Sequence, residues 1–321
     1  MPTRAERQRD RLAAAIAAAF LDGPWQPTTM AARAASDLGF APDAVGVVRR
    51  CPLARTICAD AASHAFRPRR SVHTFAAPHV GCQTLIRLDL ENFFTSINPG
   101  AVLGVFRSAG YPEQVAHCLT GLVTNAVPPA VLGAATPPIE LRSRHRHMLS
   151  MLRQPHLPQG AQTSPALANL AAYGLDCRLN GLAEAFGAAY TRYADDLAFS
   201  GGRELTRRSA KFVTLASEII TDETFSVNHR KTRIAGRAHR QILTGIVVNE
   251  SPNVPRPDFD RLKAVLHDAA SHGPSVANRD GLSDFRAHLL GRISWVAASN
   301  PQRAERLRRT FDAVDWSPRL P

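Results

Sequence analysis

The sequence predicts an α+β fold in which a small antiparallel sheet packs with helices and a purely helical region follows. Residues 84–90 read as an apolar strand that delivers Asp89 at its end. Strand-like runs on both sides of Tyr193-Ala194-Asp195-Asp196 predict a hairpin over residues 190–200. Leucines recur at helical spacing over residues 164–186, which indicates a helix directly before the hairpin.

The other elements of this core are expected on both sides of the hairpin. Two helices are predicted over residues 99–109 and 113–124, and a basic, proline-rich, exposed connection over residues 128–158. After the hairpin we expect a helix over 205–221 and strands near 225–227, 233–234 and 242–248.

Outside this core the sequence predicts helical and irregular segments and no strands. Residues 1–50 are expected to be helical, with a stop at Gly23-Pro24, and residues 51–83 to be an irregular basic segment. A string of prolines between Ser251 and Pro257 breaks the strand pattern, and residues 258–316 then read as helical with an interruption at 272–280. We therefore predict boundaries at 1–50, 51–83, 84–250 and 251–321.

Composition narrows the class of partner. The chain has 321 residues, 45% of them hydrophobic, so it can bury a core. Lys and Arg number 39 against 27 Asp and Glu, a net charge of +12 in which arginine dominates. Arginine pairs bidentately with phosphate, so nucleic acid is the first expectation for a partner. Genomic base composition is the alternative reason for the arginine content.

The cysteines and the N-terminus indicate a cytoplasmic protein. Five cysteines lie far apart, form no CxxC pair and are odd in number, which argues against a zinc module or a disulfide framework. Residues 12–21 are apolar after four arginines, as in a signal peptide, but they are alanine-rich and too short to span a membrane. A helix is the expected structure, and no membrane association is expected.

Three aspartates form the candidate catalytic site. Asp195 and Asp196 are adjacent in the predicted hairpin, and Asp89 ends a strand that can lie beside it. Carboxylate oxygens are the ligands of Mg²⁺, which keeps open positions for phosphate groups. The sequence therefore predicts a site for two Mg²⁺ ions held by these three carboxylates.

The motifs resemble those of bacterial reverse transcriptases, nearest to the retron type. Asp89 with Phe94, the segment from Leu157 to Pro165, and Tyr193-Ala-Asp-Asp196 match the order and approximate spacing of motifs A, B and C. Residues 228–232 resemble motif D, and Leu243-Thr-Gly245 resembles a triplet typical of retron enzymes. The resemblance covers residues 62–316 and implies a right-hand polymerase with a palm over 84–250, a helical thumb over 251–321 and reduced fingers over 51–83.

The resemblance also implies roles for individual residues. Asp89, Asp195 and Asp196 would bind the metal ions, with Leu90 a further ligand through its carbonyl. Lys231 would donate a proton to the departing pyrophosphate. The residues that match nucleotide-binding positions are Phe94, as a gate against the ribose 2′-hydroxyl, and Gln159 and Gly160.

Nucleic-acid contacts are expected before and after the palm. The basic residues concerned are Arg67, Arg69, Arg70 and His79 before it, and Arg256, Arg261, Lys263 and His267 in the thumb. The expected partners are a structured RNA that serves as template and primer, the nascent DNA, dNTPs, and an effector protein encoded nearby. The resemblance also implies a role in antiviral defence.

The match departs in the fingers. Relatives of this type carry about 60 further residues before the equivalent of His64, so the upper fingers look truncated or absent, or lost through an error in the gene model. Three functions therefore stay open: an RNA-directed DNA polymerase, a catalytically weak scaffold that binds structured RNA, and a template-independent nucleotidyl transferase.

Overall fold

The computed structural model describes residues 61–132 and 142–317. The helices predicted over residues 1–50 lie outside this part. The chain forms two compact units. The first includes Leu90–Arg178 and Ser217–Val227, and the second includes Arg67–Asp89, Leu179–Ala216 and the chain from Asn228 onward.

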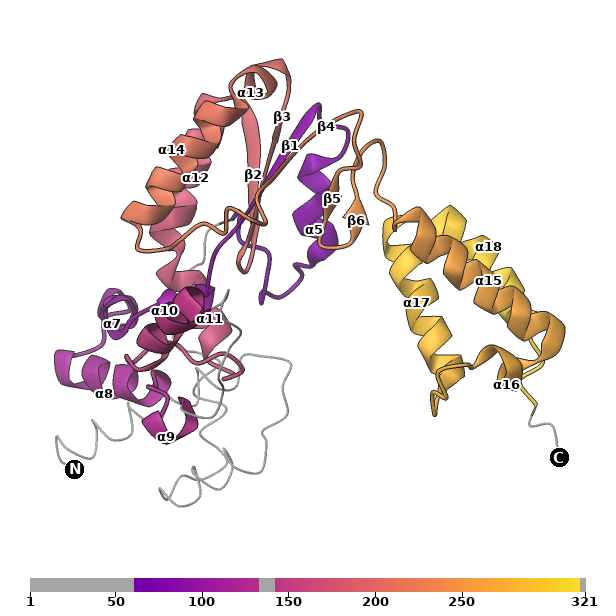
Figure 1. The fold of residues 1–321 in the computed structure, drawn as a ribbon, viewed down its shortest axis with the longest axis horizontal. Helices are drawn as coiled ribbons and strands as arrows, with labels where there is room; N and C mark the ends of the chain where they lie inside the picture. Colours follow the sequence, from indigo (N-terminus) through magenta and orange to yellow (C-terminus); the bar gives the residue numbers. More distant parts are fainter. Residues whose placement is uncertain (1–60, 133–141, 318–321) are drawn as a thin grey trace, which may run out of the picture. The chain divides into compact units, whose positions relative to one another are not determined.

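A four-stranded antiparallel sheet organises the second unit (Figure 1). Its strands are β1 (Thr84–Asp89), β2 (Ala188–Tyr193), β3 (Asp196–Gly201) and β4 (Arg233–Gly236), in the order β2-β3-β1-β4. The predicted strand and hairpin are confirmed. The run near 233–234 is also a strand, whereas residues 225–227 contribute only an isolated bridge between Leu90 and Val227.

The two faces of this sheet bury different side chains, because alternate residues of a strand point to opposite sides. On one face, the ring of Phe199 packs against Phe212 of α14 (Ser209–Asp222), with ring centroids 4.9 Å apart. Leu205 of α13 (Arg203–Arg207) is also fully buried. The predicted helix over 205–221 is therefore two helices, separated at Arg208.

The opposite face carries a second buried cluster. Leu85 and Ala198 pack there with Phe75 of α5 (Val72–Ala76) and with Leu243 and Ile246 of the β5–β6 hairpin (Ile242–Leu243 and Ile246–Val247). Figure 1 shows α5 and this hairpin on the side of the sheet away from α14. This cluster covers the face that ends in Asp89 and Asp196.

The β5–β6 turn consists of Thr244 and Gly245. Both have positive φ, +44° and +86°, which a two-residue turn matching the strand twist requires. Glycine tolerates this backbone, whereas the β-branched Thr244 is strained there. The predicted strand over 242–248 is thus a tight hairpin.

The first unit is helical in its described part. Its helices are α6 (Phe93–Ser96), α7 (Pro99–Ser108), α8 (Glu113–Val123), α9 (Pro129–Leu132), α10 (Arg142–Leu152) and α11 (Ser164–Ala171), and α12 (Tyr173–Ala185) begins in it. The basic, proline-rich connection predicted over residues 128–158 contains a helix, α10. Residues 142–152 contain no proline or glycine, so nothing in them breaks a helix.

Helices form the C-terminal part of the second unit. They are α15 (Arg256–His272), α16 (Pro274–Ala277), α17 (Phe285–Ser299) and α18 (Pro301–Asp312). Leu262, Leu266, Ile293 and Phe311 belong to their shared buried core. The helical prediction is confirmed here, and Gly273, with φ +97°, ends α15 at the expected interruption. Among the described helices, none combines the length and the apolar character needed to cross a membrane.

Candidate functional site

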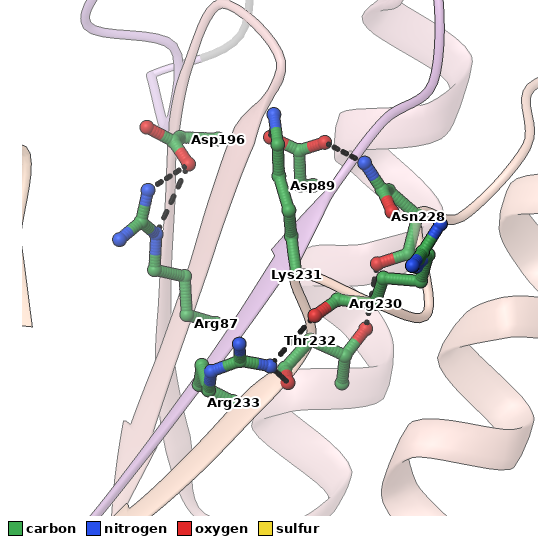
Figure 2. Close-up of polar contacts among 8 residues, drawn as sticks. All are labelled: Arg87, Asp89, Asp196, Asn228, Arg230, Lys231, Thr232 and Arg233. Carbon is green, nitrogen blue, oxygen red and sulfur yellow. Dashed lines mark hydrogen bonds and ion pairs between the residues drawn. The ribbon is translucent and has the colours of Figure 1, made fainter. Parts of the chain in front are cut away.

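Asp89 and Asp196 lie directly opposite each other on neighbouring strands. Asp89 ends β1, Asp196 begins β3, and the two residues are partners in the antiparallel register. Both side chains therefore lie on the same face of the sheet (Figure 2). Like charges in this arrangement repel, so a sheet that places them together requires compensating cations.

Two side chains bind Asp89, which is only 5% exposed. Lys231 Nζ lies 3.0 Å from Asp89 Oδ1, and Asn228 Nδ2 donates a hydrogen bond of 3.1 Å to Asp89 Oδ2. The hydrogen bond and the charge of Asp89 raise the pKa of Lys231, so this amine stays protonated. Both oxygens of Asp89 are thereby held in a defined orientation.

A tight turn delivers Asn228 and Lys231 to Asp89. The amides of Lys231 and Thr232 donate to the carbonyl of Asn228 at 3.0 and 3.1 Å, and the amide of Asn228 donates to the carbonyl of Asp89 at 2.7 Å. Arg233 closes the turn by donating from Nη1 to the carbonyls of Arg230 and Thr232, both at 2.8 Å (Figure 2). The turn is thus anchored to the end of β1.

Arg87 compensates the charge of Asp196. It lies two residues before Asp89 on β1, so its side chain lies on the same face of the sheet. Its Nε and Nη2 atoms lie 3.1 and 2.8 Å from Asp196 Oδ1 (Figure 2). Both side chains are partly accessible, 33% and 17%, so a solute can displace this pair.

The turn between β2 and β3 holds Asp195 and stores backbone strain. Ala194 has φ +56°, a left-handed conformation that costs about 1–2 kcal/mol for a residue with a Cβ. The fully buried Arg192 donates from Nη1 to the carbonyl of Ala194 at 3.2 Å and so supports this turn from behind. Strain of this kind is common at functional sites.

Asp195 is the least compensated of the three aspartates. Burial raises its pKa, and the negative charges of Asp196 and Asp89 raise it further. A hydrogen bond from its own backbone amide and the charge of Lys231 act in the opposite direction without cancelling the rise. A carboxylate that resists ionisation in this way is suited to a cation.

The chemistry of the three carboxylates suits a divalent cation, whereas in this structure Lys231 and Arg87 contact two of them. Three carboxylates supply hard oxygen ligands, and the charges that raise the pKa of Asp195 favour a bound cation. Within residues 61–132 and 142–317, no three acidic, histidine or cysteine side chains are grouped as ligands of one ion. Lys231 and Arg87 contact Asp89 Oδ1 and Asp196 Oδ1 instead, so a cation would compete with them for these oxygens.

The predicted nucleotide-binding residues all belong to the first unit. Leu90 is buried and bridges to Val227. The ring of Phe94 lies against the ring of Phe93, with centroids 5.4 Å apart. Gln159 and Gly160 are exposed, and Gly160 has φ +95°, a backbone conformation that favours glycine.

The predicted nucleic-acid contacts are exposed with two exceptions. Arg69 and Arg70 are exposed in the second unit, and Arg67 is half-buried. The prediction for His79 is wrong in this structure, because its ring is fully buried. Its two nitrogens lie 2.7 Å from the hydroxyls of Ser200 and Thr191. Four thumb residues are exposed, namely Arg256, Arg261, Lys263 and His267.

Sequence reasoning missed the partners of the aspartates. Arg87 could have been found from the two-residue period of a strand, since it shares the face of Asp89. Asn228 was part of the resemblance to motif D, but no local pattern pairs its side chain with a residue 139 positions earlier. Arg192 lay in a strand-like run and carried no signal of burial.

Comparisons with known proteins agree with this architecture. Residues 53–248 match the family described as reverse transcriptase (RNA-dependent DNA polymerase). The retron Mx65 reverse transcriptase of Myxococcus xanthus is 38% identical over 247 residues, which are 77% of this chain and 53% of that protein. The retron Mx162 reverse transcriptase of the same organism is 34% identical over 80% of this chain and 52% of that protein.

This chain thus spans about half the length of these two curated relatives. Among solved structures, apo telomerase of Candida tropicalis truncated from its C-terminal domain aligns with a TM-score of 0.42 and 12% identity, over 72% of this chain and 49% of that one. The family match covers all four strands of the sheet and includes all three aspartates. The chain belongs to the reverse transcriptase family, in its bacterial retron type, and its sheet with the flanking helices has the palm fold of that family.

Proposed function

We propose that this protein is an RNA-directed DNA polymerase whose catalytic centre is Asp89, Asp195 and Asp196. The observation that carries the proposal is the register that sets Asp89 opposite Asp196, with Asp195 in the adjoining turn. Concentrated negative charge of this kind is costly unless it binds cations. Family membership supplies the reaction class.

Divalent metal ions are general cofactors of reverse transcriptases. Two Mg²⁺ ions held by the three aspartates would supply Lewis acidity at the primer hydroxyl and at the leaving phosphate. The carbonyl of Leu90 is a candidate further ligand. The aspartates contribute the ligands and the fixed geometry, which the strand register sets.

The reaction forms a bond between the primer 3′-oxygen and the α-phosphorus of a dNTP, and the proton of the primer 3′-hydroxyl passes to solvent water. The reaction also breaks the bond from the α-phosphorus to the bridging oxygen. Pyrophosphate leaves with the electron pair of that bond. Lys231 is protonated and is the candidate donor of a proton to this oxygen. Because its amine bonds Asp89 Oδ1 here, Lys231 must exchange that partner for the phosphate when the substrate binds.

The remaining roles concern selection and binding. Phe94 would exclude a ribose 2′-hydroxyl, and Gln159 with Gly160 would lie along the incoming nucleotide. Arg67, Arg69, Arg70, Arg256 and Lys263 would contact phosphates of the template and primer. Two relatives are named retron reverse transcriptases, and we propose on that ground a structured RNA as template and primer. Cytoplasmic action in antiviral defence with an effector protein encoded nearby is part of the same proposal.

A primer-extension assay tests the function. The purified protein, with a primer on an RNA template, Mg²⁺ and dNTPs, is expected to extend the primer by the template sequence. Asp195→Asn is expected to lower the rate by about 10³-fold, because a metal ligand is lost while the shape is kept. Asp280→Asn, at an exposed loop position, is the matched control and should keep full activity.

Two other outcomes would contradict the proposal. Extension that ignores the template sequence would indicate a template-independent nucleotidyl transferase. Tight binding of structured RNA without primer extension, by the wild type and by Asp280→Asn alike, would indicate a scaffold.

A further inference from the structure

The segment that follows Asn228 carries an unusual concentration of positive charge. Residues 229–240 include five Arg or Lys residues, two histidines and no acidic residue. All seven side chains are exposed. We call this surface the basic edge, defined by His229, Arg230, Lys231, Arg233, Arg237, His239 and Arg240.

Several arginines on the C-terminal helices have local acidic partners. On α18, Arg308 and Arg309 pair with Asp312 and Glu305, one helical turn away. On α15, Arg256 pairs with Asp260 in the same way. These charges are compensated within their own helix.

Arginines of the basic edge lack such partners. In the part of the chain that the structure describes, the ion pairs include no carboxylate bound to Arg230, Arg237 or Arg240. The guanidinium of Arg233 bonds only backbone carbonyls of the turn. The positive charge of this surface is therefore open to an external anion.

Protection of a sheet edge explains only part of this charge. Strand β4 pairs with β1 alone, and cations on an edge strand discourage pairing with another chain. However, β4 ends at Gly236, so Arg237 and Arg240 lie beyond the strand. Their charges need another explanation.

The loop that carries Arg237 and Arg240 is held in place. Asn249 Nδ2 donates to the carbonyls of Arg237 and His239 at 3.3 and 2.8 Å. The fully buried Gln241 donates from Nε2 to the carbonyl of Ala235 at 3.1 Å. An ordered backbone lowers the entropy lost on binding, so these arginines are preorganised for a ligand.

We propose that the basic edge binds the phosphodiester backbone of the RNA used by this protein, on a stretch beyond the duplex at Asp89. The four residues of β4 span about 13 Å at about 3.3 Å per residue, which is on the order of a few phosphates of one strand. The turn at Asn228 connects this surface to Asp89, so a strand bound there is continuous with the candidate active site. The assignment to RNA rests on the proposed function, whereas phosphate binding does not.

Binding measurements across salt concentrations test the proposal. The full-length variant Arg230→Gln, Arg237→Gln, Arg240→Gln is compared with wild type on a labelled RNA hairpin that has a single-stranded extension. Each lost phosphate contact lowers the slope of log K against log salt by about 0.7, so three contacts predict a loss of about 2. Affinity at low salt should fall on the order of tenfold.

A second variant controls for net charge. Arg203→Gln, Arg207→Gln, Lys211→Gln removes the same three charges from exposed positions on α13 and α14. It is expected to keep the wild-type slope. Equal slopes for the two triple variants would overturn the proposal, since charge alone would then explain the change.

Two further substrates test where on the RNA the basic edge binds and whether it recognises phosphate or RNA. A hairpin trimmed to its short duplex should bind wild type and the first variant equally, and loss on this substrate as well would overturn the placement beyond the duplex. A hairpin with a DNA extension of the same sequence separates two kinds of recognition. If the phosphates are recognised, the first variant loses the same affinity on both extensions. If RNA itself is recognised, the loss is larger on the RNA extension. Primer extension on the short duplex reports the proposed polymerase separately, because it needs none of the three arginines.

Discussion

Charged side chains are paired differently in the palm sheet and in the C-terminal helices. On α18 and α15, arginines pair with carboxylates one turn away in exposed positions. At the end of the sheet, Asp89 faces Asp196, and the compensating cations come from distant parts of the chain or from the neighbouring strand. Pairing within a helix compensates the charge of each arginine, whereas like charges placed side by side favour the binding of an oppositely charged ligand.

The ion pairs of α15 and α18 and the contacts around Asp89 and Asp196 should also differ in their effect on stability. The helical pairs are expected to contribute little to stability, because solvent screens them. The contacts around Asp89 and Asp196 are partly buried and hold the geometry of the candidate metal site. Substitutions in the two regions should therefore differ in kind as well as in size.

Among the side chains that support the aspartates, the largest effect is expected from Asn228→Ala. Loss of the hydrogen bond to Asp89 Oδ2 frees the carboxylate to rotate, and such supporting contacts are worth about 10–100-fold in metal affinity or activity. The Mg²⁺ concentration for half-maximal extension should rise, and Mn²⁺ binding without substrate should weaken in parallel. Asn180→Ala removes an exposed amide contact to Glu184 and should change neither value. An unchanged metal dependence in Asn228→Ala would argue against a positioning role.

The pH dependence of stability should reveal the repulsion at Asp195. Its pKa in the folded protein is raised, so the ionised form destabilises the fold. The stability linked to this group is complete below the ordinary value of 3.8 and is lost as the pH rises through the raised pKa. In a chelating buffer, Asp195→Asn should therefore raise Tm more at pH 7 than at pH 4. A gain that is equal at both pH values would contradict this assignment.

A smaller effect is expected from Arg87→Gln. Without metal, loss of the pair with Asp196 should lower the free energy of unfolding by about 1 kcal/mol, as for a partly exposed ion pair. With Mg²⁺ present the difference should shrink, because the ion takes over the charge of Asp196. Denaturant unfolding with and without Mg²⁺ measures both values. Arg178→Gln, which removes a pair with Asp222 and Glu223 instead, is the control and should show no Mg²⁺ dependence.

The smallest effect is expected from Arg309→Gln on α18. Its pair with Glu305 joins exposed side chains four residues apart, a contact worth about 0.3–0.5 kcal/mol. Thermal unfolding at low and high salt should show a small loss that salt removes. A loss above that of Arg87→Gln would reverse the proposed contrast between the two regions.

Much of the architecture could be predicted because its signals are local. The apolar run before Asp89 and the runs around Asp195-Asp196 are strands, and the leucine period marks α11 and α12. Composition was a poor guide to structure in two segments. The connection over 128–158 is rich in proline and arginine, yet its proline-free middle forms α10. His79 lies in a basic segment, yet Ser200 and Thr191 satisfy its ring inside the palm.

The sequence alone determined on which elements the three candidate carboxylates lie, because a strand end and a hairpin turn are defined by neighbouring residues. Only the tertiary structure decided how those charges are balanced. The strand register sets Asp89 against Asp196, and a turn 139 residues after Asp89 brings Asn228 to its carboxylate. Such contacts depend on chain closure over long separations, which no local pattern encodes. The same reason applies to the basic edge, whose arginines are visible in the sequence but whose lack of acidic partners is a property of the folded chain.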